Sequence, residues 1–282
     1  MKIGIVKDKA GYGRWGEECY KKMKEHGFSC ADFDMSDTYG WPYDAPEEEV
    51  VSEFSRERKL AEEAGIEIWQ VHGPWRFPLM EETEEGRVKY LEILKKSIRY
   101  TAVLGCKNWV IHPVMPCGWE DPGREEETWR VNVDFFTELV KTAKECGVTI
   151  CIENMPFGNL SVSRPESIMK LVNTINDDNF KICMDTGHIG IFEDLSIGDA
   201  VRCFGDKLQV LHVHDTIPGK DIHIMPYFGK INWEEFLTAL KEIGFKGVFN
   251  LETPSSKNID TPVFEIISKA LAVLAKEMSK EL

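Results

Sequence analysis

The sequence predicts an α/β fold of the (β/α)8 TIM barrel type, and three observations support this prediction. Eight short apolar segments alternate with eight longer amphipathic segments along the 282 residues. The short segments are apolar throughout rather than alternating, which is typical of parallel strands covered on both faces. No linker or change in composition divides the chain, and such barrels commonly form one domain of ~250 residues. We therefore expect a single domain over residues 1–282, with an open doubly wound sheet as the alternative.

The expected elements follow one another in strict order, each strand preceding a helix. The strands are expected at residues 2–6, 29–34, 66–71, 108–111, 148–152, 181–184, 209–213 and 248–251. The helices are expected at residues 14–26, 47–64, 87–104, 125–146, 165–176, 196–204, 232–243 and 261–277. Several of these helices are followed by the glycine that commonly ends a helix, namely Gly27, Gly65, Gly105, Gly147 and Gly244.

Composition and charge argue against some classes of partner. The formal net charge is −14, whereas nucleic acids and anionic membranes are bound by basic surfaces, so neither is an expected partner. The first residues are too poor in apolar side chains for a signal peptide, and no apolar run approaches the ~20 residues of a membrane span. The eight cysteines form no Cys-x-x-Cys pair, as expected of reduced thiols. We therefore expect a cytoplasmic protein, and the sequence leaves a homo-oligomer open.

A glycine pattern near the amino terminus suggests a different interpretation. Gly11, Gly13 and Gly16 fit the G-x-G-x-x-G pattern of dinucleotide-binding folds, and Asp32 and Asp34 follow about 20 residues later. In those folds the first glycine lies at the end of the strand, because the turn must place a helix amino terminus against the pyrophosphate. Residues 7–10 intervene here, so we interpret the glycines as a flexible first loop.

In the later strands, the apolar run stops at an ionisable residue. These residues are His72, His112, Glu153, Asp185 with His188, His212 with His214, and Glu252. Asp221 and His223 follow the seventh strand closely and are expected in a loop that contains Gly219 and Pro226. The carboxyl ends of all strands of a closed barrel meet at one face. Carboxylates brought together there repel one another unless a cation lies among them. An oxygen-rich divalent site with one imidazole can be formed by Glu153, Asp185, His212 and Glu252.

The strand-end motifs resemble those of the xylose isomerase-like barrel superfamily, in the order H-G-P, I-H-P, E-N, D-T-G-H, H-V-H-D, D-x-H and L-E-T. That superfamily includes sugar-phosphate isomerases and epimerases, ketose 3-epimerases, inosose dehydratase and endonuclease IV. The resemblance implies one divalent metal ion (Mn, Co, Mg or Zn) bound by Glu153, Asp185, His212 and Glu252. It also implies that Glu153 and Glu252 act as acid and base in an isomerase or epimerase, which converts a sugar, sugar phosphate or related polyol through an enediolate.

Other branches of the superfamily imply other chemistries. The additional zinc ligands of endonuclease IV match His72, His112, His188, Asp221 and His223. A zinc phosphodiesterase with up to three zinc ions is therefore one alternative. A lyase like inosose dehydratase is another, and a barrel that binds metal and sugar without catalysis is a third. The acidic charge of the chain favours a small sugar or polyol over a DNA backbone.

If the protein converts a sugar, the five residues that match the additional zinc ligands of endonuclease IV are expected to bind either the substrate or additional metal. Among them, His188 matches a substrate-binding histidine of the epimerases. Trp75 and His214 are also expected to contact the substrate, Trp75 through the apolar face of the sugar. The ketose 3-epimerases have an arginine shortly after the strand-seven histidine, and residues 216–220 contain none. We therefore do not assign epimerisation at C3 specifically.

Overall fold

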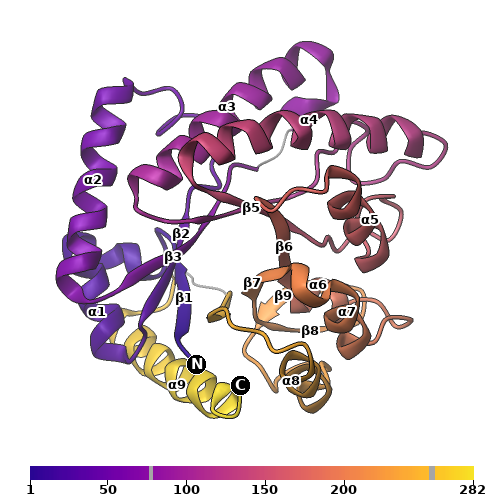
Figure 1. The fold of residues 1–282 in the computed structure, drawn as a ribbon. Helices are drawn as coiled ribbons and strands as arrows, with labels where there is room; N and C mark the ends of the chain where they lie inside the picture. The colour runs from indigo at the N-terminus through magenta and orange to yellow at the C-terminus, as the bar shows by residue number, and fades with distance from the viewer. Residues whose placement is uncertain (76–78, 254–257) are drawn as a thin grey trace.

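The computed structural model describes residues 1–75, 79–253 and 258–282. Eight parallel strands in the order β10-β1-β2-β3-β4-β5-β6-β7 curl into a barrel (Figure 1). The strands are β1 (Ile3–Lys7), β2 (Cys30–Asp34), β3 (Glu67–His72), β4 (Asn108–Ile111), β5 (Thr149–Glu153), β6 (Phe180–Asp185), β7 (Leu208–His212) and β10 (Phe249–Leu251). Val213 nearly closes the ring, because its N–H donates to Asn250 O at 2.8 Å and its carbonyl accepts from Glu252 N at 3.0 Å. The predicted TIM barrel is confirmed.

The helices lie outside the strands (Figure 1). They are α1 (Cys19–His26), α2 (Glu47–Ala64), α3 (Glu84–Val103), α4 (Glu125–Cys146), α5 (Pro165–Ile175), α6 (Thr186–Gly190), α7 (Ile197–Phe204), α8 (Trp233–Glu242) and α9 (Thr261–Ser279). The short 3-10 segments are η1 (Tyr12–Glu18), η2 (Met80–Glu82) and η3 (Gly205–Lys207). Helix α9 contacts α1 and β1, so the last helix covers the first strand. None of the described helices is long and apolar enough to span a membrane.

Helix α4 illustrates how the sequence produces these elements. Its first turn contains three glutamates, residues 125–127, whose charge complements the partial positive charge of a helix amino terminus. Val131, Phe135 and Leu139 recur every four residues and are buried, so one face of the helix packs against the barrel. Gly147, with a φ of 65°, adopts the left-handed conformation that ends the helix.

Helix α6 is not among the expected helices, and two further segments also differ from the expectation. The segment that carries Asp221 and His223 is expected as a loop, but it forms an antiparallel hairpin of β8 (Asp215–Ile217) and β9 (Lys220–Ile224). Gly219, with a φ of 72°, permits the tight turn between these two strands. The amino-terminal glycine segment is also expected as a loop, but η1 buries Tyr12 completely in the hydrophobic core. The hairpin matters for function because it brings Asp221 and His223 to the barrel mouth.

Candidate metal centre and substrate cleft

Four side chains from four strand ends meet at the carboxyl end of the barrel. Glu153 ends β5, Asp185 ends β6, His212 ends β7, and Glu252 directly follows β10. Each offers one ligand atom, and these four atoms lie within 4.8 Å of one another. The first three side chains are buried, and the Glu252 side chain is 20% exposed. The structure therefore brings together the four residues that the sequence predicts as metal ligands.

His212 is at the centre of this cluster. Its Nδ1 lies 3.0 Å from Glu153 Oε1 and 3.1 Å from Glu252 Oε2. Its Nε2 lies 3.0 Å from Asp32 Oδ2. Burial lowers the pKa of the imidazole, but the neighbouring Cys183, Glu252 and Glu153 together raise it well above its usual value. Without a cation, the ring is therefore held as an imidazolium among carboxylates.

The carboxyl groups of the cluster have opposite electrostatic environments. Burial raises the pKa of Glu153, but the neighbouring His212 and His112 outweigh it and hold the pKa well below its usual range. Burial raises the pKa of Glu252 to about 8. The buried Glu153 Oε2 has no hydrogen-bond partner. This orphaned oxygen faces His72 and His112. The Glu153 carboxylate, together with the carboxyl groups of Asp185 and Glu252 and the His212 ring, forms a donor set that fits a divalent cation.

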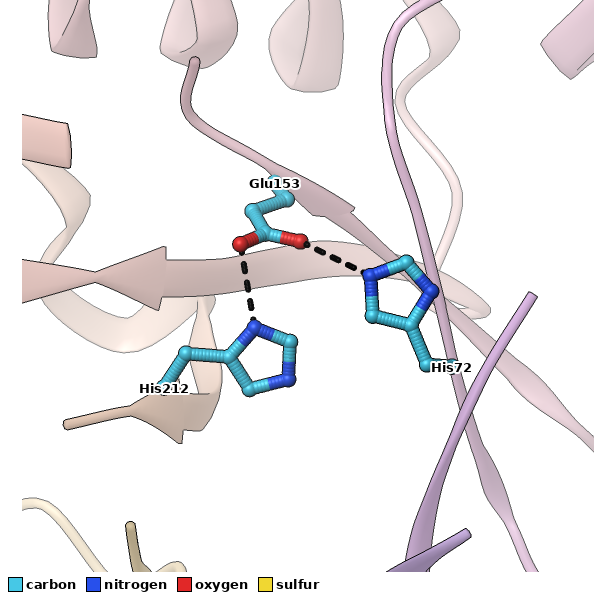
Figure 2. Close-up of side chains that lie close together, drawn as sticks. All are labelled: His72, Glu153 and His212. Carbon is cyan, nitrogen blue, oxygen red and sulfur yellow. Dashed lines mark hydrogen bonds and ion pairs between the residues drawn. The ribbon is translucent and has the colours of Figure 1, made fainter. Parts of the chain in front are cut away.

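Glu153 also faces two histidines from neighbouring strands. Figure 2 shows its carboxylate between His212 on one side and His72 on the other, with His72 Nε2 3.7 Å from Oε2. His112 Nε2 lies 3.3 Å from the same oxygen. His72 Nδ1 lies 2.8 Å from Gly73 O and must donate to it, so its Nε2 is the nitrogen directed at Glu153. Burial lowers the pKa of His112 to about 4, which keeps that ring neutral.

A second cluster lies beside the first and consists of His188, Asp221 and His223. Asp221 Oδ2 is 3.3 Å from His188 Nε2, and Asp221 Oδ1 is 3.3 Å from His223 Nε2. Burial lowers the pKa of His188, but Asp185 and Asp221 outweigh it and raise the pKa to about 10. The pKa of His223 is also raised, to about 9, mainly by the hydrogen bond of its ring to Asp221. The three ligand atoms lie within 4.8 Å of one another, so this cluster is a second candidate cation site.

His214 and Trp75 have different environments. His214 is fully buried, donates to Asp215 O through Nδ1, and has its Nε2 2.8 Å from Asp185 Oδ2. Its ring stacks on that of His223 with the centroids 3.8 Å apart. It is absent from the described lining of the cleft, whereas Trp75 is part of it. Substrate contact by both residues remains a prediction, and only Trp75 is placed to make it directly.

The cleft above the metal centre has two parts with different chemistry. One part, of about 360 Å³, is lined by acidic side chains that include Asp8 and Asp34. The other, of about 300 Å³, has an apolar wall that includes Met155 and Phe157. Both parts share His72, Trp75, Asp221, His223 and Glu252. The cleft therefore exposes the candidate ligand Glu252 to a small molecule on both sides.

Sequence reasoning missed the role of Asp32. It interprets this residue only through the dinucleotide pattern, but the side chain is 1% exposed and contacts His212. Two acids within the short strand β2 (Cys30–Asp34) were the available signal, since a carboxylate inside a buried strand needs a partner. Nothing in the sequence indicates that this partner is His212, 180 positions away.

The comparisons with known proteins agree with the barrel fold. A family model described as "Xylose isomerase-like TIM barrel" matches residues 20–277. The chain belongs to this family. A crystal structure of a D-tagatose 3-epimerase-like protein superposes with a TM-score of 0.77 at 25% identity, over 100% of this chain and 99% of the other.

Two curated relatives have named activities. A D-psicose 3-epimerase of Ruminiclostridium cellulolyticum is 27% identical over 197 residues, which are 67% of this chain and 64% of that enzyme. An inosose isomerase of Bacillus subtilis is 29% identical over 176 residues, which are 60% of this chain and 62% of that enzyme. The match spans slightly less than two thirds of the length of each enzyme. The homologues of this chain therefore include sugar epimerases and isomerases.

Proposed function

We propose that this protein is a divalent-metal-dependent isomerase or epimerase of a sugar or related polyol. The observation that carries the proposal is the convergence of Glu153, Asp185, His212 and Glu252, whose ligand atoms lie within 4.8 Å of one another. The named relatives support the same class of reaction, because both act on sugars or sugar-like rings according to their names. A metal-dependent lyase of the inosose dehydratase type would need the same four ligands.

In this proposal the two glutamates transfer the proton. When bound, a divalent cation would polarise the carbonyl of the substrate and so acidify the neighbouring C–H group. Glu153 reaches the cleft from β5 and Glu252 from beyond β10, so one can remove the α-proton and the other can return it. His188, Trp75 and the apolar wall around Phe157 would orient the substrate and exclude water.

The charge of the cleft favours a substrate without a phosphate group. The described lining residues include six carboxyl groups, those of Asp8, Asp32, Asp34, Glu153, Asp221 and Glu252, and neither lysine nor arginine. Even with one divalent cation and protonated His188 and His223, the six carboxylates leave the cleft with a net negative charge. A dianionic phosphate would be repelled, whereas sugar hydroxyls can donate hydrogen bonds to these carboxylates. We therefore propose a neutral sugar or polyol as the substrate.

The test is exchange of the substrate's α-hydrogen with solvent deuterium in metal-loaded protein, followed by NMR against a panel of ketoses and inososes. Glu153→Gln and Glu252→Gln are expected to lower the exchange rate by at least about 1,000-fold, because each removes a proton carrier. Glu234→Gln, on the outer surface of α8, is the matched control and should exchange at the parent rate. Activity of either site variant within a few-fold of the parent would refute the acid/base assignment.

A zinc phosphodiesterase is the second candidate, and the second cluster favours it. It requires that His188, Asp221 and His223 bind one further ion and that His72 and His112 bind another with Glu153. Metal analysis of the purified protein distinguishes the two candidates. A stoichiometry near one supports the sugar enzyme, whereas a stoichiometry near three, together with cleavage of DNA at abasic sites, supports the phosphodiesterase.

A further inference from the structure

Asp32 lies in β2, beneath the metal centre, and is not one of the four candidate ligands. One of its oxygens, Oδ2, accepts three hydrogen bonds from three other strands. The donors are Gln70 Nε2 at 2.9 Å, His212 Nε2 at 3.0 Å and Asn250 Nδ2 at 3.2 Å. All four side chains are at most 1% exposed. A single carboxylate oxygen in the barrel interior is thus fixed from three directions.

This contact determines which nitrogen of His212 carries a proton. A carboxylate only accepts hydrogen bonds, so Nε2, which faces Asp32, must be protonated. Nδ1 faces Glu153 at 3.0 Å and Glu252 at 3.1 Å, so it is the nitrogen that would lose its proton and offer a lone pair when a cation binds. Histidines that bind metals commonly donate their other N–H to a carboxylate, which fixes the ring orientation and makes the ligand more basic.

The surroundings of Asp32 are built to hold it in place. The amide oxygens of Gln70 and Asn250 are buried without hydrogen-bond partners, whereas both amide nitrogens donate to Asp32 Oδ2. Leaving a buried acceptor unpaired costs about 1–3 kcal/mol. Gly4 on β1 makes room for this arrangement, since a Cβ there would lie 2.5 Å from Asn250 Oδ1. Asp32 Oδ1 is also buried without a hydrogen-bond partner, so the three donors are directed at Oδ2 alone.

We propose that Asp32 is a positioning residue, which holds His212 in the Nε2–H tautomer and so directs Nδ1 toward the cation. The inference rests on the proposed function, because it assumes that His212 is a metal ligand. It predicts that the chain without the Asp32 carboxylate binds a divalent ion about 10–100-fold more weakly, the usual effect of removing such an outer partner. In this proposal Asp32 acts through His212 and is not itself a ligand of the ion.

The experiment compares Asp32→Asn with Asp34→Asn. Both variants remove one carboxylate charge from β2. Among the described residues, Asp34 accepts hydrogen bonds from Ser36 and from no candidate metal ligand. Calorimetric titration with Mn²⁺ should show the 10–100-fold loss for Asp32→Asn and less than a threefold change for Asp34→Asn. The ¹⁵N–¹H spectrum of histidine rings in Zn²⁺-loaded parent protein should show His212 protonated at Nε2 and metal-bound at Nδ1. Asp32→Asn should shift or broaden that Nε2–H signal.

Three results would overturn the proposal. They are equal Mn²⁺ affinity of Asp32→Asn and the parent, an equal loss in Asp34→Asn, or a His212 ring bound to Zn²⁺ through Nε2. The spectrum of the parent protein gives the third result even if Asp32→Asn does not fold. None of these measurements uses a sugar, so the proposed reaction can fail while the role of Asp32 stands. If the parent protein binds no divalent ion, the proposed function fails first and is recognised separately.

Discussion

Binding of a divalent ion at Glu153, Asp185, His212 and Glu252 should release protons from the protein. Ligands must be deprotonated before they bind a metal, so a proton held in the metal-free state has to leave. Burial raises the pKa of Glu252 to about 8, so most of these groups are protonated at pH 7. His212, whose pKa is raised well above its usual value, holds up to one more. We therefore expect the release of one to two protons per ion at pH 7.

The sign of the pH dependence follows from the same two groups. Because the pKa values of Glu252 and His212 are both raised, a higher pH deprotonates these two groups and so strengthens metal binding. Each released proton makes the apparent affinity rise about tenfold per pH unit below the pKa of the group. Between pH 6 and 7 the apparent affinity for Mn²⁺ should therefore increase about 10–100-fold. Above pH 8 the contribution of Glu252 should disappear.

Calorimetric titration with Mn²⁺ in buffers of different ionisation enthalpy counts the released protons. Glu252→Gln should lower the count at pH 7 by up to about one proton, because the amide carries no titratable proton. Glu81→Gln is the control, since it removes another buried carboxyl with a raised pKa, one that is not part of the cluster, and should leave the count unchanged. A count below about 0.5 in the parent, with affinity constant from pH 6 to 8, would refute the reasoning.

Three further predictions concern stability and specificity. Burial raises the pKa of Glu81 to about 7, so the free energy of unfolding should fall by up to about 3 kcal/mol as pH rises from about 4.5 to 7. Glu81→Gln should remove this pH dependence, which urea unfolding at pH 5 and pH 8 measures. The Asp215 carboxylate accepts from Tyr227 N, Ile231 N and Trp233 Nε1 at 2.9–3.1 Å, so Asp215→Asn should cost about 2–3 kcal/mol in thermal unfolding. Neutral ketoses should bind metal-loaded protein at least about tenfold more tightly than their phosphates, and the reverse order in calorimetry would contradict the neutral-substrate proposal.

The eight-stranded barrel follows from the sequence because its signals are local. Segment β4 (Asn108–Ile111) is a short apolar run that is buried at all four positions, and the predicted bounds match the observed ones. The strand-end residues Glu153 and His212 are 59 positions apart, but the closed topology alone requires that they share one rim. Knowledge of the fold therefore predicts the convergence without any knowledge of side-chain contacts.

The sequence does not predict the features that depend on particular long-range contacts. The β8–β9 hairpin carries polar side chains such as Lys220 and Asp221 on exposed or half-exposed positions, so it has the composition of a loop. The carboxylate of Asp215 holds the following segment through Tyr227 N and Ile231 N, a contact that no periodic pattern reveals. The same holds for Asp32, because its role depends on a contact with His212, which lies 180 positions later in the chain.

Proton counting also tests whether the second cluster binds a cation. His188 Nδ1 must donate to Asn154 O at 2.7 Å, and His223 Nδ1 must donate to Glu252 O at 3.1 Å, because a carbonyl only accepts. The Nε2 atoms of both rings face the acceptor-only carboxylate of Asp221, so each contact needs either a second ring proton or a cation. The raised pKa values, about 10 and about 9, correspond to the protonated alternative. Saturation with Zn²⁺ at pH 7 should therefore release at most two protons if a single ion binds at the four-ligand cluster, and about four if the second cluster fills as well.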